Sequence, residues 1–140
     1  MKSGLYQQIE KPTLLVDEEK ARKNLKRMAE KAAAQHIRFR PHFKTHQSAQ
    51  IGEWFREAGV TAITVSSLSM ASYFADDGWG DILVAFPVNL REMRTIRELS
   101  AKVKLGLLVE STASVMALGE ATALPLDIWI KIDTGLHRAG

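Results

Sequence analysis

Short apolar runs alternate along this chain with segments whose apolar residues recur at helical spacing. The runs predict β-strands at residues 14–16, 38–42, 62–65, 82–86, 103–109 and 127–132. Helices are predicted between them, beginning after Asp17, Ser48, Asn89 and Ser111 or Thr112, with a shorter one at residues 70–75. This alternation, with strand starts about 20 to 25 residues apart, is typical of parallel sheets joined by helical crossovers.

The strands are apolar on both faces, which is expected when helices cover a parallel sheet. Two architectures satisfy that pattern, a (β/α) barrel and an open doubly wound sheet, and periodicity does not choose between them. A complete barrel needs about eight β/α units and roughly 250 residues, whereas the chain has 140. An incomplete barrel exposes its inner face and its edges, so we expect a longer parent protein or another chain to complete it.

The composition narrows the function classes. Hydrophobic residues make up 46% of the chain and charged residues 25%, and no stretch resembles a signal peptide or a membrane span. The absence of cysteine excludes disulfides and thiolate metal sites and fits a cytosolic protein. The net charge of +3 is spread along the chain, which argues against nucleic acid as a partner but allows a local site for a small anion.

The densest chemical cluster lies at residues 40–46, at the end of a predicted strand. If the strand stays extended, Arg40, His42, Lys44 and His46 share one face. Neighbouring cations and partial desolvation favour the neutral amine of a lysine, which is the form that Schiff-base chemistry requires. Two alternatives stay open: an ordinary solvated loop lysine, and a metal site formed by His42 and His46, whose spacing suits a helix better than a strand.

A second polar segment, residues 133–140, follows the last predicted strand. Its glycines permit tight turns and close approach to a ligand, and Arg138 could hold an anionic oxygen. An ordinary loop with an exposed arginine explains the same residues, whereas an aspartic protease is excluded by the β–α alternation. Other side chains at strand ends would surround the same mouth of a barrel: Ser66, Ser67, Pro87, Glu110 and Ser111.

Three stretches together resemble a known family, the D-threonine aldolase and D-serine dehydratase branch of the alanine racemase-like, fold-type III enzymes that use pyridoxal 5′-phosphate (PLP). They are residues 11–17 (Lys-Pro-Thr-Leu-Leu-Val-Asp), residues 40–46 (Arg-Pro-His-Phe-Lys-Thr-His) and residues 131–140 (Lys-Ile-Asp-Thr-Gly through Arg-Ala-Gly). The resemblance implies a (β/α) TIM-type barrel that is incomplete here. Residues 1–140 would be the N-terminal part of the PLP-binding barrel, without its later strands or a C-terminal β-domain.

The resemblance also implies roles for single residues. Lys44 would form the Schiff base with PLP, Arg138 would approach the phenolic oxygen of the cofactor, and His42 would lie beside it. No metal ligand is expected within the 140 residues, although the C-terminal part of such enzymes carries a divalent metal.

The implied function is that of a PLP-dependent lyase acting on a D-amino acid. It would be a β-hydroxy-D-amino acid aldolase, similar to D-threonine aldolase, or a D-serine dehydratase, with racemisation as a third outcome. A homodimer in the cytoplasm is expected, with no nucleic acid or membrane as a partner. The alternatives are a non-catalytic PLP carrier on a related barrel, and an inactive fragment that folds only by self-association.

Overall fold

The computed structural model describes residues 3–123 and 125–140. The helices are α1 (Ser3–Tyr6), α2 (Glu18–Ala34), α3 (Ala49–Glu57), α4 (Leu68–Asp76), α5 (Met93–Ser100) and α6 (Thr112–Ala121). The strands are β1 (Ile63–Val65), β2 (Asp81–Pro87), β3 (Lys104–Val109) and β4 (Asp127–Ile130). Two 3₁₀ turns, η1 (Phe43–Thr45) and η2 (Leu90–Glu92), complete the described elements.

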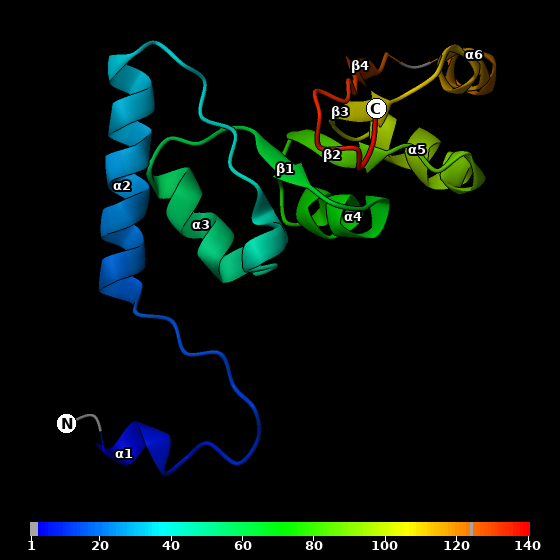
Figure 1. Cartoon of the computed structure of the whole chain (residues 1–140). Helices are drawn as coiled ribbons and strands as arrows, with labels where there is room; N and C mark the ends of the chain where they lie inside the picture. The colour runs from blue at the N-terminus through cyan, green and yellow to red at the C-terminus, as the bar shows by residue number, and fades with distance from the viewer. Residues whose placement is uncertain (1–2, 124) are drawn as a thin grey trace.

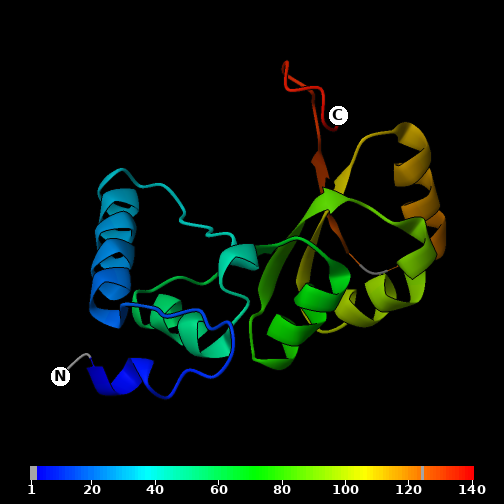
Figure 2. The same ribbon diagram turned by 60° about the horizontal axis from the view of Figure 1, so that its bottom comes forward.

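The strands form one parallel sheet in the order β1-β2-β3-β4. Helices α4, α5 and α6 all lie along the same face of this sheet (Figures 1 and 2). A doubly wound sheet reverses its strand order and carries helices on both faces, whereas sequential strands with helices on one side form a sector of a barrel. The predicted α/β fold and incomplete TIM-type barrel are therefore confirmed.

Most predicted helix starts are confirmed by side-chain caps. Asp17 accepts a hydrogen bond from the Lys20 amide at 3.0 Å, and Ser48, Ser67 and Ser111 cap α3, α4 and α6 in the same way. Each cap satisfies a backbone donor that the first helical turn leaves unpaired. The start at Asn89 is confirmed as well, although its first turn is the 3₁₀ turn η2.

Two strand predictions need correction. Residues 14–16 are not a strand: they lie outside every described element, with Leu14 78% and Val16 48% exposed. A strand exists only where a neighbour accepts its hydrogen bonds, and no neighbour lies beside this segment among the described residues. Residues 38–42 run beside β1, where the Thr64 amide donates to the Pro41 carbonyl at 2.8 Å, but a single bridge between His42 and Thr64 makes no named strand.

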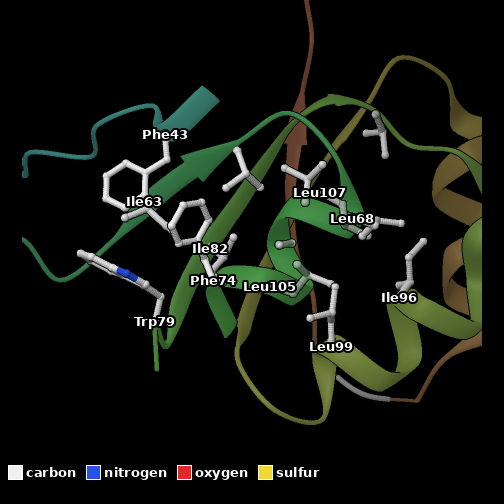
Figure 3. Close-up of a cluster of buried hydrophobic side chains, with 14 of the residues drawn as sticks. Phe43, Ile63, Leu68, Phe74, Trp79, Ile82, Ile96, Leu99, Leu105 and Leu107 are labelled. Atoms are coloured by element: carbon white, nitrogen blue, oxygen red, sulfur yellow. The ribbon is translucent and has the colours of Figure 1, made fainter. Parts of the chain in front are cut away.

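The hydrophobic core lies between the sheet and its helices. Figure 3 shows Phe43, Phe74 and Trp79 at one end of this core, and leucine and isoleucine side chains of β3 and α5 at the other. Phe43 is fully buried and contacts Phe74 and Trp79 with ring centroids 4.9 and 5.2 Å apart. The residue that precedes Lys44 is therefore anchored in the core.

The opposite face of the sheet is the inner face of the barrel sector. Gly106 lies between Leu83 and Trp129, and a Cβ at this position would lie 3.0 Å from Leu83 Cδ1 and 3.3 Å from Trp129 Nε1. The close approach of these two side chains explains a glycine in the middle of β3.

Charged side chains occupy the beginnings of the strands. The Asp81 carboxylate, which opens β2, accepts from Arg40 at 2.7 Å and also from Arg38. Burial alone raises the pKa of Asp81, but the hydrogen bonds from the two guanidinium groups outweigh burial and hold that pKa below its ordinary value. Lys104 and Asp127 pair at 3.2 Å where β3 and β4 begin. The N-terminal end of the sheet therefore carries charged side chains that are paired with one another.

No helix in residues 3–123 or 125–140 combines the length and apolar character needed to cross a bilayer.

Candidate functional site

A pocket of about 640 Å³ lies at the C-terminal ends of the strands. This volume falls within the range of roughly 300–1,000 Å³ that small-molecule sites occupy. Parallel barrels place their sites at this end, because the loops after successive strands converge there. The pocket is lined by His42, Lys44, Ser66, Ala85, Phe86, Pro87, Leu108, Glu110, Lys131, Arg138 and Ala139.

Lys44 reaches the pocket from the turn η1. The His42 Nδ1 atom accepts a hydrogen bond from the Lys44 amide at 3.2 Å, and the Gln47 Nε2 atom donates to the Lys44 carbonyl at 3.2 Å. The Phe43 ring is fully buried in the core and so holds the turn in place. These contacts fix the backbone of Lys44 while its side chain stays exposed.

A shared face for Arg40, His42, Lys44 and His46 requires an extended strand over residues 40–46, and this condition fails from Phe43 onward. A 3₁₀ turn advances about 120° per residue, so η1 interrupts the alternation that an extended strand would maintain. Arg40 instead points to Asp81 at the other end of the sheet. Only His42 and Lys44 of these four residues line the pocket.

His42 and His46 are both partly buried. Burial lowers the pKa of His42, and the nearby charge of Lys44 lowers it further. His42 is therefore neutral at pH 7, and because its Nδ1 accepts from a backbone amide, its proton lies on Nε2.

His46 packs in the aromatic cluster rather than in the pocket. Its ring lies 4.5 Å from that of Phe43 and stacks on Phe55 at 5.7 Å, and burial lowers its pKa. Its Nδ1 accepts from the Ser48 amide at 3.2 Å. Across residues 3–123 and 125–140, no group of three or more side chains could hold a metal ion.

The loop after β4 brings Arg138 to the same pocket. The Asp133 Oδ1 atom accepts from the amides of Gly135 at 2.9 Å and His137 at 3.0 Å, and its Oδ2 lies 3.1 Å from His137 Nδ1. The hydrogen bond from the His137 amide is the main cause that lowers the pKa of Asp133. These bonds fold the loop back on the strand ends, so that Arg138 and Ala139 line the pocket beside Lys44.

The strand-end residues divide into two groups. Ser66, Pro87 and Glu110 line the pocket as predicted, whereas Ser67 and Ser111 cap helices. The sequence does not single out Lys131 as a site residue, although it directly follows β4 and lies two residues after Trp129, on the same side of the chain. Side chains alternate between the two faces of a sheet along a strand, so continuing this alternation one residue past β4 places Lys131 at the C-terminal mouth of the barrel.

The pocket has part of the donor set that PLP requires. Lys44 supplies a primary amine, and Arg138 and Lys131 supply positive charge for an anionic ligand. None of these three cations forms an ion pair within the described ranges. Phe86 and Pro87 add apolar surface against which a flat ring can pack. The residues present therefore fit a planar, anionic aldehyde.

Comparison with known proteins agrees with this geometry. The family model for the alanine racemase N-terminal domain matches residues 16–140. A D-threo-3-hydroxyaspartate dehydratase from Delftia sp. (strain HT23) is 34% identical over 138 residues, which cover 94% of this chain and 36% of that protein. A D-serine dehydratase from Schizosaccharomyces pombe (strain 972 / ATCC 24843) is 31% identical over 146 residues, which cover 96% of this chain and 35% of that protein.

Solved structures show the same fold. The structure of the Delftia sp. HT23 dehydratase superposes with a TM-score of 0.86 at 33% identity, over 95% of this chain and 36% of that one. A D-threonine aldolase from Filomicrobium marinum superposes with a TM-score of 0.88 at 24% identity, over 94% of this chain and 37% of that one, and this match concerns the fold alone. The chain thus spans little more than a third of the length of the relatives it matches.

Proposed function

The chain belongs to the alanine racemase N-terminal domain family, and from this premise we propose that it is part of a PLP-dependent lyase acting on β-hydroxy-D-amino acids. The observation that carries the proposal is the meeting of Lys44 and Arg138 at one pocket, although one precedes β1 and the other follows β4. An amine and a guanidinium beside a pocket of this size can hold a small anionic aldehyde.

The proposed substrates share one chemical feature. The names of the relatives refer to D-serine, to D-threo-3-hydroxyaspartate and to 3-hydroxy-D-aspartate. Each of these compounds is an α-amino acid with a hydroxyl group on its β-carbon. We propose the same class for this protein, with aldol cleavage or loss of water as the reaction.

The proposed roles follow from what each side chain can do. Lys44 would hold the cofactor through its amine, and the same amine could hold or move a proton at Nζ. Arg138 would donate hydrogen bonds to the phenolic oxygen. His42, neutral with its proton on Nε2, can only donate from that atom. When bound, PLP supplies an electron sink for the carbanion that forms at the α-carbon of the substrate.

The complete activity is proposed for a longer protein. Ile130 on β4 is 75% exposed and Phe86 is 64% exposed, so the sheet presents apolar surface that further strands could cover. We propose that later barrel strands and a C-terminal β-domain supply the remaining ligands of PLP, a divalent metal and a dimer interface. A cytoplasmic location is proposed because the chain lacks cysteine.

The test is a covalent-labelling experiment on the protein as its gene encodes it. We expect a visible absorption band with PLP, and borohydride reduction should fix the pyridoxyl group on Lys44. Lys44→Ala should abolish the adduct, whereas Lys23→Ala, on the exposed side of α2, should retain it. An adduct that persists at another lysine in the Lys44→Ala protein would refute the assignment.

Turnover then separates an enzyme from a carrier. D-Threonine, D-serine and D-threo-3-hydroxyaspartate should be tested for aldehyde, keto acid and ammonia. Release of any of these products supports the lyase. An adduct on Lys44 without any product would favour the alternative of a non-catalytic carrier.

A further inference from the structure

Two histidines lie on either side of Lys44 and bind the backbone of its turn in the same way. The Nδ1 atom of His42 accepts from the Lys44 amide at 3.2 Å, and the Nδ1 atom of His46 accepts from the Ser48 amide at 3.2 Å. Each imidazole therefore binds the amide two residues ahead of it. The first bond lies at the start of η1, and the second joins the end of η1 to the N-cap residue of α3.

Both hydrogen bonds require a neutral ring. A neutral imidazole has one nitrogen that accepts and one that donates, whereas an imidazolium has two donors and no acceptor. A proton added at Nδ1 would place one N–H group against another, at Lys44 and at Ser48 alike. The turn would then keep only the contacts that do not depend on the histidines, such as the bond from the Gln47 side chain to the Lys44 carbonyl.

His46 is the more constrained of the two rings. Its Nε2 atom is buried and has no hydrogen-bond partner within residues 3–123 and 125–140. The ring packs among the side chains of Phe43, Phe55 and Phe74. A charged ring would therefore have two N–H groups without acceptors in apolar surroundings, which is costly. Protonation of His46 should drive the ring out of the aromatic cluster and towards water.

The neighbouring elements offer no negative charge to either ring on the side of α2 and α3. A groove of about 420 Å³ lies beside both imidazoles, and α2, α3 and residues 39–46 line it. Apart from the two histidines, none of its lining side chains can carry a charge. The neighbours from the other elements are also uncharged, since Thr64 of β1 pairs with His42 and Phe74 of α4 contacts His46.

On its other side His42 faces the pocket, whose charges are mostly positive. Lys44, Lys131 and Arg138 line this pocket together with one carboxylate, Glu110. The charge of Lys44 and, above all, burial lower the pKa of His42, and burial lowers the pKa of His46. The surroundings of both rings therefore favour the neutral form that the turn requires.

We propose that His42 and His46 form an acid-sensitive clamp on the turn that presents Lys44, so that protonation of the two rings loosens this turn and releases PLP. In this role both histidines position Lys44 through the backbone. The inference rests on the proposed function only for the identity of the ligand, because the loosening of the turn is a property of the chain itself.

The size of the effect follows from the ordinary pKa of histidine. An imidazole in water titrates near ~6.5, and the pKa of each ring in the closed turn lies below its ordinary value. The open turn therefore binds more protons, and the closed turn loses stability as the pH falls below about 6.5. At about pH 5.5, one unit lower, each ring favours the open turn by up to about tenfold.

The first measurement is hydrogen exchange of residues 43–48 in the full-length protein without PLP. Peptide mass spectrometry gives the protection of this segment at about pH 7.5 and about pH 5.5, corrected for the pH dependence of exchange in an unfolded chain. We expect the protection in the wild type to be about tenfold lower at the lower pH. Equal protection at the two pH values overturns the inference.

Variants separate the hydrogen-bond acceptor from the charge. In His42→Asn and His46→Asn the side-chain oxygen takes the place of Nδ1, accepts from the amide two residues ahead and does not titrate. The double asparagine variant should therefore stay protected at both pH values. His42→Gln places its amide group at the distance of Nε2 instead, and should be less protected than the wild type even at about pH 7.5.

His36→Asn is the matched control. It removes an exposed histidine that binds neither amide, so the pH dependence of the wild type should persist. Thermal unfolding shows whether each variant is folded. If the loss of the His46 ring from the aromatic cluster prevents folding, His42→Asn alone must reduce the pH dependence, and an unchanged dependence in this variant overturns the clamp.

The second measurement is the affinity for PLP at the same two pH values, followed by visible absorption. Acid weakens any Schiff base by protonating the free amine, so the wild type is compared with the double asparagine variant, which shares this effect. We expect the loss of affinity between about pH 7.5 and about pH 5.5 to be about tenfold greater in the wild type. An equal loss in both proteins overturns the claim that the clamp controls the cofactor.

The clamp and the proposed function fail in different ways. A wild type that carries pyridoxyl on Lys44 after borohydride, but whose protection and PLP affinity follow those of the double asparagine variant, overturns the clamp and leaves the proposed function intact. A wild type without pyridoxyl on Lys44 refutes the proposed function, and the exchange of residues 43–48 still decides whether the two histidines hold the turn.

Discussion

Replacing Phe43 by alanine tests whether the hydrophobic core holds the turn that presents Lys44. The Phe43 side chain is fully buried, with ring centroids 5.0 Å from Phe55, 4.9 Å from Phe74 and 5.2 Å from Trp79. Its backbone lies next to Lys44, so any rearrangement around the ring is transmitted directly to the pocket.

The magnitude follows from the burial. Removing a fully buried phenylalanine ring costs about 3–5 kcal/mol, because transfer free energy is lost and a cavity is left. Phe43→Leu keeps most of the volume and loses the edge-to-face contacts, which predicts a cost of about 1–2 kcal/mol. A single domain is stable by roughly 5–15 kcal/mol, so the leucine variant stays folded even if the alanine variant does not.

The assay is urea unfolding followed by tryptophan fluorescence, with Met116→Ala as the control. Met116 is 61% exposed on α6, and its truncation should change stability by less than about 0.5 kcal/mol. The yield of pyridoxyl on Lys44 after borohydride should be lower in Phe43→Leu than in Met116→Ala. A cost below about 1 kcal/mol for Phe43→Ala would refute the claim that this ring anchors the turn.

Three further predictions concern the sheet and its surroundings. Asp81→Asn should cost about 1–3 kcal/mol in urea unfolding, because it removes a half-buried partner of Arg40. Since the folded pKa of Asp81 is depressed, this cost should be full above about pH 5 and shrink as the pH falls below about 4; a cost independent of pH would contradict it. Gly106→Ala should cost about 1–3 kcal/mol by overpacking, and the double variant with Leu83→Ala should cost less than the sum of the single changes. Burial lowers the pKa of His46, so the unfolded chain binds more protons and stability drops as the pH falls below about 6.5. His46→Leu should reduce the difference between the urea midpoints at about pH 7.5 and about pH 5.5. An unchanged difference would contradict the burial of His46 as the cause of this pH dependence.

Local structure could be read from the sequence because its causes are local. Caps such as Asp17 and Ser48 act on an amide three residues ahead, and Gly59 ends α3 with a φ of +80° that other residues adopt at a cost. The apolar runs became β1 to β4 within one or two residues at most boundaries. The exceptions, residues 14–16 and 38–42, show the limit, because an apolar run becomes a strand only where a neighbouring strand pairs with it over several residues.

Within the site, the sequence alone was sufficient to single out Lys44, His42 and Arg138 as candidates, since each lies at or after the end of an apolar run. It did not predict that Arg40 pairs with Asp81, which lies 41 residues later in the chain. Nor did it predict that His46 leaves the site, because the 3₁₀ turn at Phe43 depends on a ring buried in a core that distant helices build. Lys131 became visible as a pocket residue only in three dimensions. Capping hydrogen bonds and apolar periodicity act over a few residues, so the sequence determines them directly. The strand register and the direction of each turn decide which side chains meet. Both are set by packing between residues far apart along the chain, which only the tertiary structure shows.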